Sequence, residues 1–402
     1  MPERWRQLTV LSLVELLALD LWFGASAVLP TLQREWHLGA AGSAGLVIAV
    51  QLGFIAGTLA SALANLPDLW SARHLMAVGA LLGAVANGAL ALWVDSLPPA
   101  LVLRFITGVA MAGAYPPAMK IMATWFREGR GLAIGILVGA LTVGSATPWL
   151  IRGLTMLPWR QTLLTASALA LLAAVLAVTL LREGPYRFPS ARFDPRMAMA
   201  VFRERAPRLA CFGYFGHMWE LYAMWAWIGL FLVDSARDAG ARGYAGVSPS
   251  TATFAVIAIG ALGCWLGGIA SDRWGRTVAT IAAMAISGAC AATIGLTFGG
   301  PPALTLVIAL IWGVTVIADS AQFSTAITEL SPASYVGTAL TMQTCVGFAL
   351  TNVSIWLLLP IAGLVGWRWA FASLAIGPAL GVVAMARLRM APEAVRLAGG
   401  RR

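Results

Sequence analysis

Long apolar runs recur along this 402-residue chain, and they decide what it can fold into. A helix needs about 20 mostly apolar residues to cross a bilayer, and inside lipid a helix satisfies its own backbone hydrogen bonds. The chain is 59% hydrophobic and 11% charged, whereas a soluble protein carries about 25% charged residues. We therefore predict an all-α membrane protein with twelve transmembrane helices, at residues 8–30, 43–65, 74–94, 99–122, 131–151, 160–181, 209–233, 251–270, 277–298, 303–327, 336–359 and 367–387.

An internal duplication relates the first six spans to the last six. The stretch VELLALDLWFG (14–24) returns as WELYAMWAWIG (219–229), about 205 residues later, so that Glu15 aligns with Glu220. The pair DLW at Asp68 and DRW at Asp272 lies at nearly the same offset. Internal repeats with a site between them are typical of secondary transporters. The sequence thus predicts two pseudo-symmetric six-helix bundles.

A polar segment, residues 182–208, separates the two halves. It is rich in Arg and Pro, and we expect it to be a cytoplasmic linker attracted to anionic lipid headgroups. The predicted domains are residues 1–181 for the N-terminal bundle and 209–402 for the C-terminal bundle with a short tail.

Arginines in the connections predict the orientation. With both termini in the cytoplasm, 19 arginines lie on the cytoplasmic side and 6 on the outer side, as the positive-inside rule requires. The net charge of +10 does not indicate nucleic-acid binding, because the arginines lie between apolar runs and form no patch interleaved with aromatic residues. We expect a monomer whose partners are the lipid bilayer, protons and a small solute.

Several chemistries have no sequence support. The four cysteines lie in apolar runs without ligand or disulfide spacing, so we predict neither a metal site nor a cofactor. No phosphate-binding loop, Ser/His/Asp set or H-E-x-x-H motif occurs, which argues against an ATP-driven pump or a membrane enzyme.

Three short motifs resemble those of the major facilitator superfamily. They are GGIASDRWGR (267–276), similar to the loop motif of that family, RFITGVAMAG (104–113), similar to its fourth-span motif, and REGRGLAIG (127–135), similar to the start of its fifth span. The resemblance implies a bacterial inner-membrane transporter that works by alternating access. It also implies loop residues that open and close a gate, here Asp68, Arg73, Asp272, Arg273 and Arg276.

The chain departs from two branches of that family. The fifth span lacks the Gly-Pro signature of many drug/proton antiporters, and the first-half loop motif is altered around Ser71 and Arg73. No arginine lies inside the second or eighth span, where nitrate porters of this family carry their substrate arginines. We therefore assign neither drug efflux nor nitrate transport to this chain on the basis of the resemblance.

Ionisable residues inside the spans are the candidates for proton coupling. A charge at mid-bilayer costs about 2.5–3.5 kcal/mol on insertion scales. Each ionisable residue inside a span is therefore expected to have a partner or a function that offsets this cost. His217 and Glu220 lie one helical turn apart, which suggests a proton relay or a buried pair that fixes helix packing. The resemblance implies that Asp20 and Arg104 couple protonation to movement; the alternative is a fixed salt bridge between two helices.

Candidate substrate contacts come from polar and aromatic residues at matched depth. Glu15 is assigned to a central site because it aligns with Glu220, and Asp319 and Gln322 belong to a polar segment of the tenth span. Packing between helices is the alternative for each of them. Further candidates are Trp22, Tyr115, Met224 and Trp227.

The function predicted is proton-coupled secondary transport of a small solute. Open alternatives are a proton-independent uniporter, an exchanger of anions such as nitrate, cyanate or an organic anion, a transporter of metal cations, and a transport-inactive sensor. The residues do not choose between import and export, between symport and antiport, or between substrates.

Overall fold

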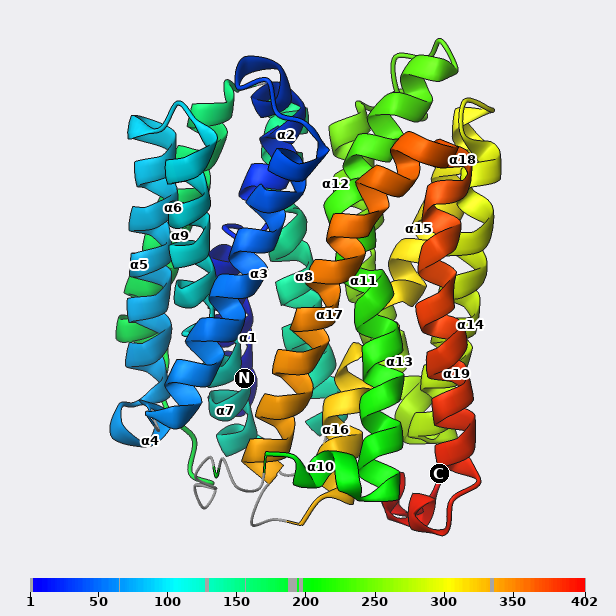
Figure 1. Ribbon diagram of the computed structural model, residues 1–402. Coiled ribbons are helices and arrows are strands. Elements are labelled where there is room, and N and C mark those ends of the chain that lie inside the picture. Colours follow the sequence, from blue (N-terminus) through cyan, green and yellow to red (C-terminus); the bar gives the residue numbers. More distant parts are fainter. Residues whose placement is uncertain are drawn as a thin grey trace.

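Helices make up the described part of this chain, in two groups that stand side by side (Figure 1). The computed structural model describes residues 3–64, 66–126, 130–155, 157–186, 194, 198–332 and 336–401. Within these ranges the extended structure amounts to an isolated bridge between Tyr244 and Val247.

The N-terminal half occupies the left of Figure 1, coloured blue to green. Its helices are α1 (Glu3–Leu19), α2 (Gly24–Glu35), α3 (Ala40–Leu63), α4 (Leu66–Leu69), α5 (Ala72–Trp93), α6 (Leu97–Met111), α7 (Tyr115–Trp125), α8 (Arg130–Thr155) and α9 (Trp159–Leu180).

The C-terminal half occupies the right, coloured green to red. Its elements are α10 (Ala200–Arg203), α11 (Arg205–Asp238), α12 (Pro249–Ala258), α13 (Gly260–Trp274), α14 (Arg276–Thr293), η2 (Ile294–Thr297), α15 (Pro302–Ala318), α16 (Ser320–Leu330), α17 (Val336–Val365), α18 (Trp367–Ala370), η3 (Phe371–Ala375), α19 (Ile376–Arg389) and η4 (Pro392–Gly400).

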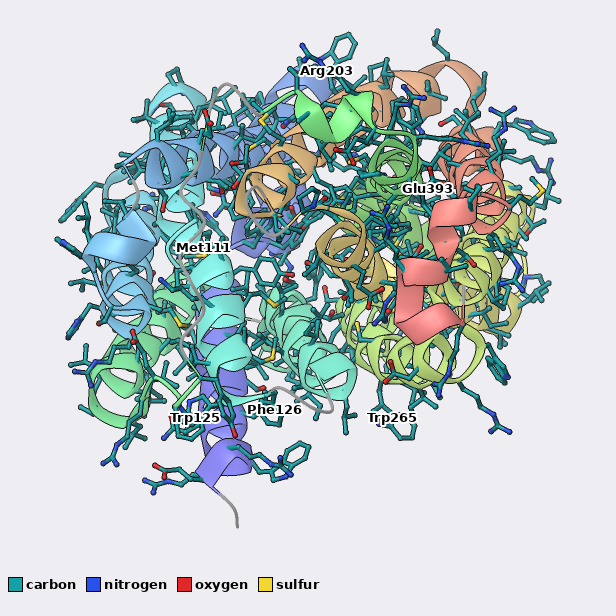
Figure 2. All side chains as sticks on the ribbon, turned by 90° about the horizontal axis from the view of Figure 1, so that it is seen from below. Met111, Trp125, Phe126, Arg203, Trp265 and Glu393 are labelled. Atoms are coloured by element: carbon teal, nitrogen blue, oxygen red, sulfur yellow. The ribbon has the colours of Figure 1, made fainter. Side chains whose placement is uncertain are left out.

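The twelve-span prediction is confirmed. Among the described residues, eleven helical segments are long and apolar enough to cross a membrane. The twelfth long helix is α11, with 34 residues, whose Trp, Tyr, His and Glu side chains make it more polar. It begins at Arg205 rather than at the predicted residue 209. Large apolar side chains cover the outside of the bundles, and Trp265, for example, projects from the rim in Figure 2.

Several spans consist of more than one helix, which the sequence did not predict. The first span breaks between α1 and α2, the fourth between α6 and α7, the eighth at Ile259, and the tenth at Asp319. A break frees backbone groups that lipid cannot satisfy, so other parts of the protein must supply their partners. These breaks therefore mark where polar side chains are needed inside the membrane.

Small residues allow the helices to approach closely. Gly53 of α3 and Gly108 of α6 face each other so tightly that a β-carbon at either one would overlap backbone of the opposite helix. Close contacts of the same kind occur at Gly263 of α13, which faces Val314 of α15, and at Gly313 of α15, which faces Val256 of α12. Because hydrophobic burial drives little association inside lipid, such close packing is a main source of stability there.

Two pairs of spans join the halves. α3 packs along α17, and α8 packs along both α12 and α13. Both chain ends and α10 lie in the lower half of Figure 1, and Figure 2 views the molecule from that end.

We expect Gly108→Ala to lower the melting temperature of the detergent-solubilised protein by several degrees. The added methyl group meets the Val50 carbonyl oxygen, and overpacking of this kind costs about 1–3 kcal/mol. Gly363→Ala is the matched control, because nothing lies within 4 Å of its β-carbon position. Equal melting temperatures for the two variants, followed by fluorescence on heating, would contradict this account of the α3–α6 contact.

Candidate functional site

The break in the first span is held by Arg104. Its guanidinium, on α6, donates hydrogen bonds to the Leu21 carbonyl at 2.9 Å and to the Trp22 carbonyl, and the side chain is 1% exposed. These carbonyls lie between α1 and α2, where the helical hydrogen-bond pattern is interrupted. Arg104 thus supplies the donors that this break requires.

The predicted ion pair between Asp20 and Arg104 is not the arrangement found. Asp20 is fully buried, and its carboxylate oxygens have no hydrogen-bond partner among the described residues. Arg104 instead binds the backbone of the two residues that follow. The physical reason is the helix break, which exposes carbonyl oxygens that compete with the carboxylate for the same donors.

A second buried polar contact crosses the break in the tenth span. Nδ1 of His217, on α11, lies 2.9 Å from Oδ1 of Asp319, and each side chain is 1% exposed. Asp319 is the residue between α15 and α16. The rings of Phe323 and Tyr214 pack against the imidazole, at centroid distances of 5.5 and 6.1 Å.

Glu220 does not contribute to this pair, so the predicted contact between His217 and Glu220 is wrong. The Glu220 carboxylate accepts hydrogen bonds from Ser287 Oγ on α14 and from Trp312 Nε1 on α15, both at 2.8 Å. His217 and Glu220 lie on the same stripe of α11, but they contact different residues of the helices that pack against α11. One turn of spacing sets the direction of a side chain and leaves open which helix lies opposite.

Glu15, the repeat partner of Glu220, has different surroundings. It is fully buried on α1, and neither of its carboxylate oxygens has a hydrogen-bond partner in the part of the chain that the structure describes. The duplication is therefore visible in sequence and in span order, but not in the contacts of these two acids.

A small central chamber lies between the halves, with a volume of about 60 Å³. Two predicted substrate residues, Trp22 and Tyr115, line it. Its other lining residues come from both halves and are Leu19, Phe54, Val138, Leu141, Tyr214, Met218, Leu221, Tyr222, Ile317, Ser320, Ser324, Thr344 and Phe348. None of these described lining residues carries a formal charge.

Two other predicted substrate residues lie in packed surroundings. Trp227 is fully buried and donates from Nε1 to the Ile355 carbonyl on α17 at 3.0 Å. Met224 is also fully buried. Neither lines the central chamber, so the structure gives both a place in helix packing.

Sequence reasoning missed most of the aromatic lining. The rings of Phe54 and Phe348 pack against each other in a tilted arrangement at a centroid distance of 4.5 Å, and Trp22 packs against both. Tyr222 contacts Phe348 at 5.0 Å and continues towards Trp225. An aromatic residue inside an apolar span carries no signal that separates a cavity wall from ordinary packing.

A second, larger cavity opens above these rings. It has a volume of about 600 Å³ and is lined by α2, the C-terminal ends of α8 and α11, and the start of α12. We call it the upper vestibule, because these elements lie at the top of Figure 1. Phe23 contacts Trp149, which lines the vestibule, as well as Tyr222, which lines the chamber. We call the rings between the two cavities the aromatic barrier: Trp22, Phe23, Phe54, Tyr222, Trp225 and Phe348.

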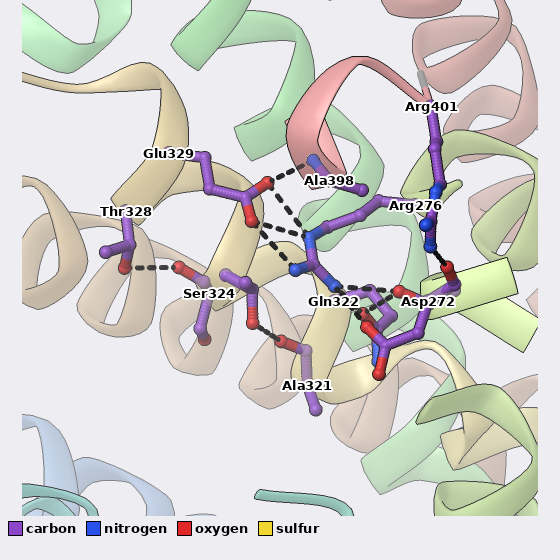
Figure 3. A network of polar contacts seen from close by, with 11 residues as sticks. Asp272, Arg276, Ala321, Gln322, Ser324, Thr328, Glu329, Ala398 and Arg401 are labelled. Atoms are coloured by element: carbon purple, nitrogen blue, oxygen red, sulfur yellow. Dashed lines mark hydrogen bonds and ion pairs between the residues drawn. The ribbon is translucent and has the colours of Figure 1, made fainter. Parts of the chain in front are cut away.

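At the lower end Arg276 is the centre of a polar network (Figure 3). Its guanidinium donates to both carboxylate oxygens of Glu329, at 2.7 to 3.1 Å. It also donates to Ser271 Oγ and to Gln322 Oε1, both at 2.8 Å. The backbone N–H of Ala398 in η4 donates to Glu329 at 3.0 Å, so the network ties α13, α14 and α16 to the C-terminal tail.

Gln322 belongs to this network, and its amide oxygen accepts from Arg276 and Ser271. Gln322 does not line the central chamber. Of the predicted gate residues, Arg273 is exposed with its guanidinium over the Trp274 ring, and Arg73 is partly exposed at the start of α5. The side chain of Asp68 lies outside the described residues.

Asp272 joins the two halves at the lower end. A β-carbon at Gly131, in the first turn of α8, would lie 3.0 Å from Oδ2 of Asp272. The carboxylate of the C-terminal half therefore meets the positive end of a helix from the N-terminal half, a favourable charge–dipole arrangement. Arg401 of the tail binds the Asp272 carbonyl (Figure 3).

Comparison with known proteins decides the family. The sequence model of the family described as Major Facilitator Superfamily matches residues 11–351. The chain belongs to the major facilitator superfamily. Among solved structures, a mutant of the nucleoside transporter NupG is similar, with a TM-score of 0.71 and 15% identity over 95% of this chain and 99% of that chain. A bacterial homologue of the human lysosomal transporter Spinster, inward-facing and unoccupied, has a TM-score of 0.66 and 17% identity over 98% of each chain. At these identities the two structures show the shared fold.

We expect Arg276→Gln to lower the melting temperature clearly more than Arg273→Gln does. The first substitution leaves Glu329 without its bidentate partner, and hydrogen bonds to charged groups contribute about 1.5–3 kcal/mol each when buried. The second removes an exposed charge from the last turn of α13. Thermal unfolding in one detergent measures both, and equal shifts would show that the Arg276 network contributes nothing to stability.

Proposed function

We propose that this transporter is a proton-coupled secondary active transporter of a small solute. Membership of the major facilitator superfamily supports transport by a multi-pass membrane protein. The finer assignment rests on the buried ionisable groups at the breaks of the first and tenth spans. The observation that supports it most is the contact between His217 and Asp319.

The His217–Asp319 pair suits a proton switch. It links α11 to the break between α15 and α16, and it is shielded from water, with both side chains 1% exposed. An ion pair forms when the imidazole carries a proton and the carboxylate does not. A further proton on Asp319 removes that attraction, so proton binding loosens the tie between α11 and the broken span. We propose that this step permits the two bundles to move.

Glu15 and Asp20 form the second proton-binding group in this proposal. An ionised carboxylate without a partner in apolar surroundings costs several kcal/mol, and binding a proton removes that cost. Asp20 lies next to the carbonyls that Arg104 holds. We propose that Arg104 exchanges these backbone carbonyls for the Asp20 carboxylate when the first span moves.

The remaining parts fit alternating access. The solute occupies the central chamber, where Trp22 and Tyr115 contact it, while the aromatic barrier separates that chamber from the upper vestibule. Asp272 against the start of α8 closes the lower end. We assign Glu220, with its partners Ser287 and Trp312, to bracing α11 inside its own bundle.

The distribution of arginines supports an orientation. We propose that the lower end of Figure 1, where both termini and α10 lie, faces the cytoplasm of a bacterium and that the upper vestibule opens outward. The bundles 1–181 and 209–402 then form a monomer in the inner membrane, and the linker contacts anionic headgroups.

The test uses purified protein in liposomes that contain a pH-sensitive dye. Organic acids, nucleosides, sugars and amines are added one at a time, with and without an imposed pH gradient. We expect at least one solute to accumulate with the gradient and to move protons as it enters. Accumulation of a solute that ignores the gradient would favour a uniporter or exchanger and would overturn proton coupling.

Asp319→Asn should reduce gradient-driven accumulation of that solute at least tenfold, because the amide cannot take up a proton. Exchange of the solute across the membrane without a gradient should persist. Asp95→Asn is the matched control, because Asp95 is exposed beside Arg160, and it should accumulate solute as the unaltered protein does. Full accumulation by the Asp319→Asn protein would remove Asp319 from the mechanism.

A further inference from the structure

The upper vestibule carries an excess of positive charge. Three arginines line it, Arg34 from α2, Arg152 from α8 and Arg237 from α11, together with a single described acid, Asp234. Asp234 is already occupied, since Oδ1 lies 3.3 Å from Arg237 and Oδ2 accepts from Trp367 Nε1 at 3.0 Å. The charges of Arg34 and Arg152 are therefore left without an acid in the described cavity lining.

Both of these arginines are anchored but retain free donors. Arg152 Nη2 donates to Thr31 Oγ1 at 2.8 Å, and Arg34 Nε donates to the Pro30 carbonyl at 3.2 Å. The anchoring partners are a hydroxyl and a carbonyl, so neither contact neutralises a guanidinium. Guanidiniums with remaining N–H groups are suited to bind a carboxylate.

The rest of the vestibule wall is apolar or polar and neutral. The apolar part is formed by Ala27, Leu29, Trp149, Ala226, Leu230 and Val233. A cavity of about 600 Å³ is within the range that holds a small organic molecule. The start of α12, at Pro249 and Ser250, also faces it, and the positive end of a helix favours an anion. The wall thus matches a molecule with an apolar body and one negative group.

We propose that the upper vestibule is a binding site for amphipathic organic anions, namely monocarboxylates with an apolar body of about the size of one or two rings. If the function proposed above holds, these anions are the transported class. The central chamber has no charged lining residue to receive a carboxylate, so the anion passes it together with a proton. The proton leaves a hydronium ion of the aqueous phase and binds a carboxylate oxygen of the anion, so that one O–H bond breaks and one forms.

The same arginines would also suit a lipid phosphate, and the experiment separates the two sources. Purified protein in phosphatidylcholine nanodiscs is titrated with 2-naphthoate, with the neutral 2-naphthamide and with the cationic 2-naphthylmethylamine. We expect saturable binding of naphthoate, at least tenfold tighter than that of either analogue. Equal binding of the amide or tighter binding of the amine would overturn the assignment.

Single-arginine variants locate the site. Arg152→Gln and Arg34→Gln should each weaken naphthoate binding about tenfold, the effect of one charge-assisted contact. Arg242→Gln is the matched control, because Arg242 is exposed on the connection between α11 and α12 and does not line the vestibule; its affinity should equal that of the unaltered protein. Unchanged affinity in Arg152→Gln protein with an unaltered melting temperature would refute the site.

Nanodiscs in which phosphatidylglycerol replaces part of the phosphatidylcholine test the lipid source. Naphthoate affinity that is independent of the lipid supports the soluble anion, whereas loss of naphthoate binding in the anionic nanodiscs assigns the arginines to a headgroup. Arg152-dependent binding without proton movement in liposomes would leave the vestibule site intact and overturn the proposed function. Proton-coupled uptake of other solutes, without naphthoate binding, would support the proposed function and overturn the vestibule site.

Discussion

Polar groups inside a membrane must find their partners within the protein, and this constraint organises the molecule. Arg104 provides the clearest case, since one buried guanidinium supplies the donors for the carbonyls freed between α1 and α2. Without such donors the broken first span would leave backbone oxygens unsatisfied in an apolar interior, at a cost of several kcal/mol. The break in turn places the Trp22 ring in the central chamber.

The two halves provide different partners for their buried acids, although their sequences repeat. In the C-terminal half Glu220 accepts two hydrogen bonds, and its helix, α11, runs unbroken for 34 residues. In the N-terminal half Glu15 has no hydrogen-bond partner among the described residues, and the first span is broken after Leu19. Glu220 is therefore held by two fixed donors, whereas its repeat partner Glu15 has none in the described part of the chain, so the duplication does not extend to the contacts of these two acids.

The number of spans, the division into halves and the family could be predicted from the sequence. Each depends on a property that a chain carries locally: runs of about 20 apolar residues, a repeated pattern, and motifs such as the one ending at Arg276. Asp20, His217 and Asp319 could also be recognised as exceptional, because charge inside an apolar run needs an explanation. Their roles remain predictions.

The partners of these residues could not be predicted, because helical periodicity gives a direction and not a neighbour. His217 and Glu220 share a face of α11 but contact different residues: His217 contacts Asp319, and Glu220 binds Trp312 of α15 and Ser287 of α14. Gln322 follows Asp319 by one turn, yet it belongs to the Arg276 network. The break in the first span was missed as well, because Leu21, Trp22 and Phe23 favour a continuous apolar span and the donors for the freed carbonyls come from Arg104 on another helix.

Infrared difference spectroscopy of the purified protein, recorded as the pH is changed, tests the central claim without any substrate. Protonated carboxylic acids in apolar surroundings absorb apart from ionised ones, so each proton-binding acid gives its own band. The account predicts a pH-dependent carboxylic acid band that disappears in Asp319→Asn protein and remains in Glu220→Gln protein. Difference spectra that are unchanged by the Asp319 substitution, in protein that retains its fold, would contradict it.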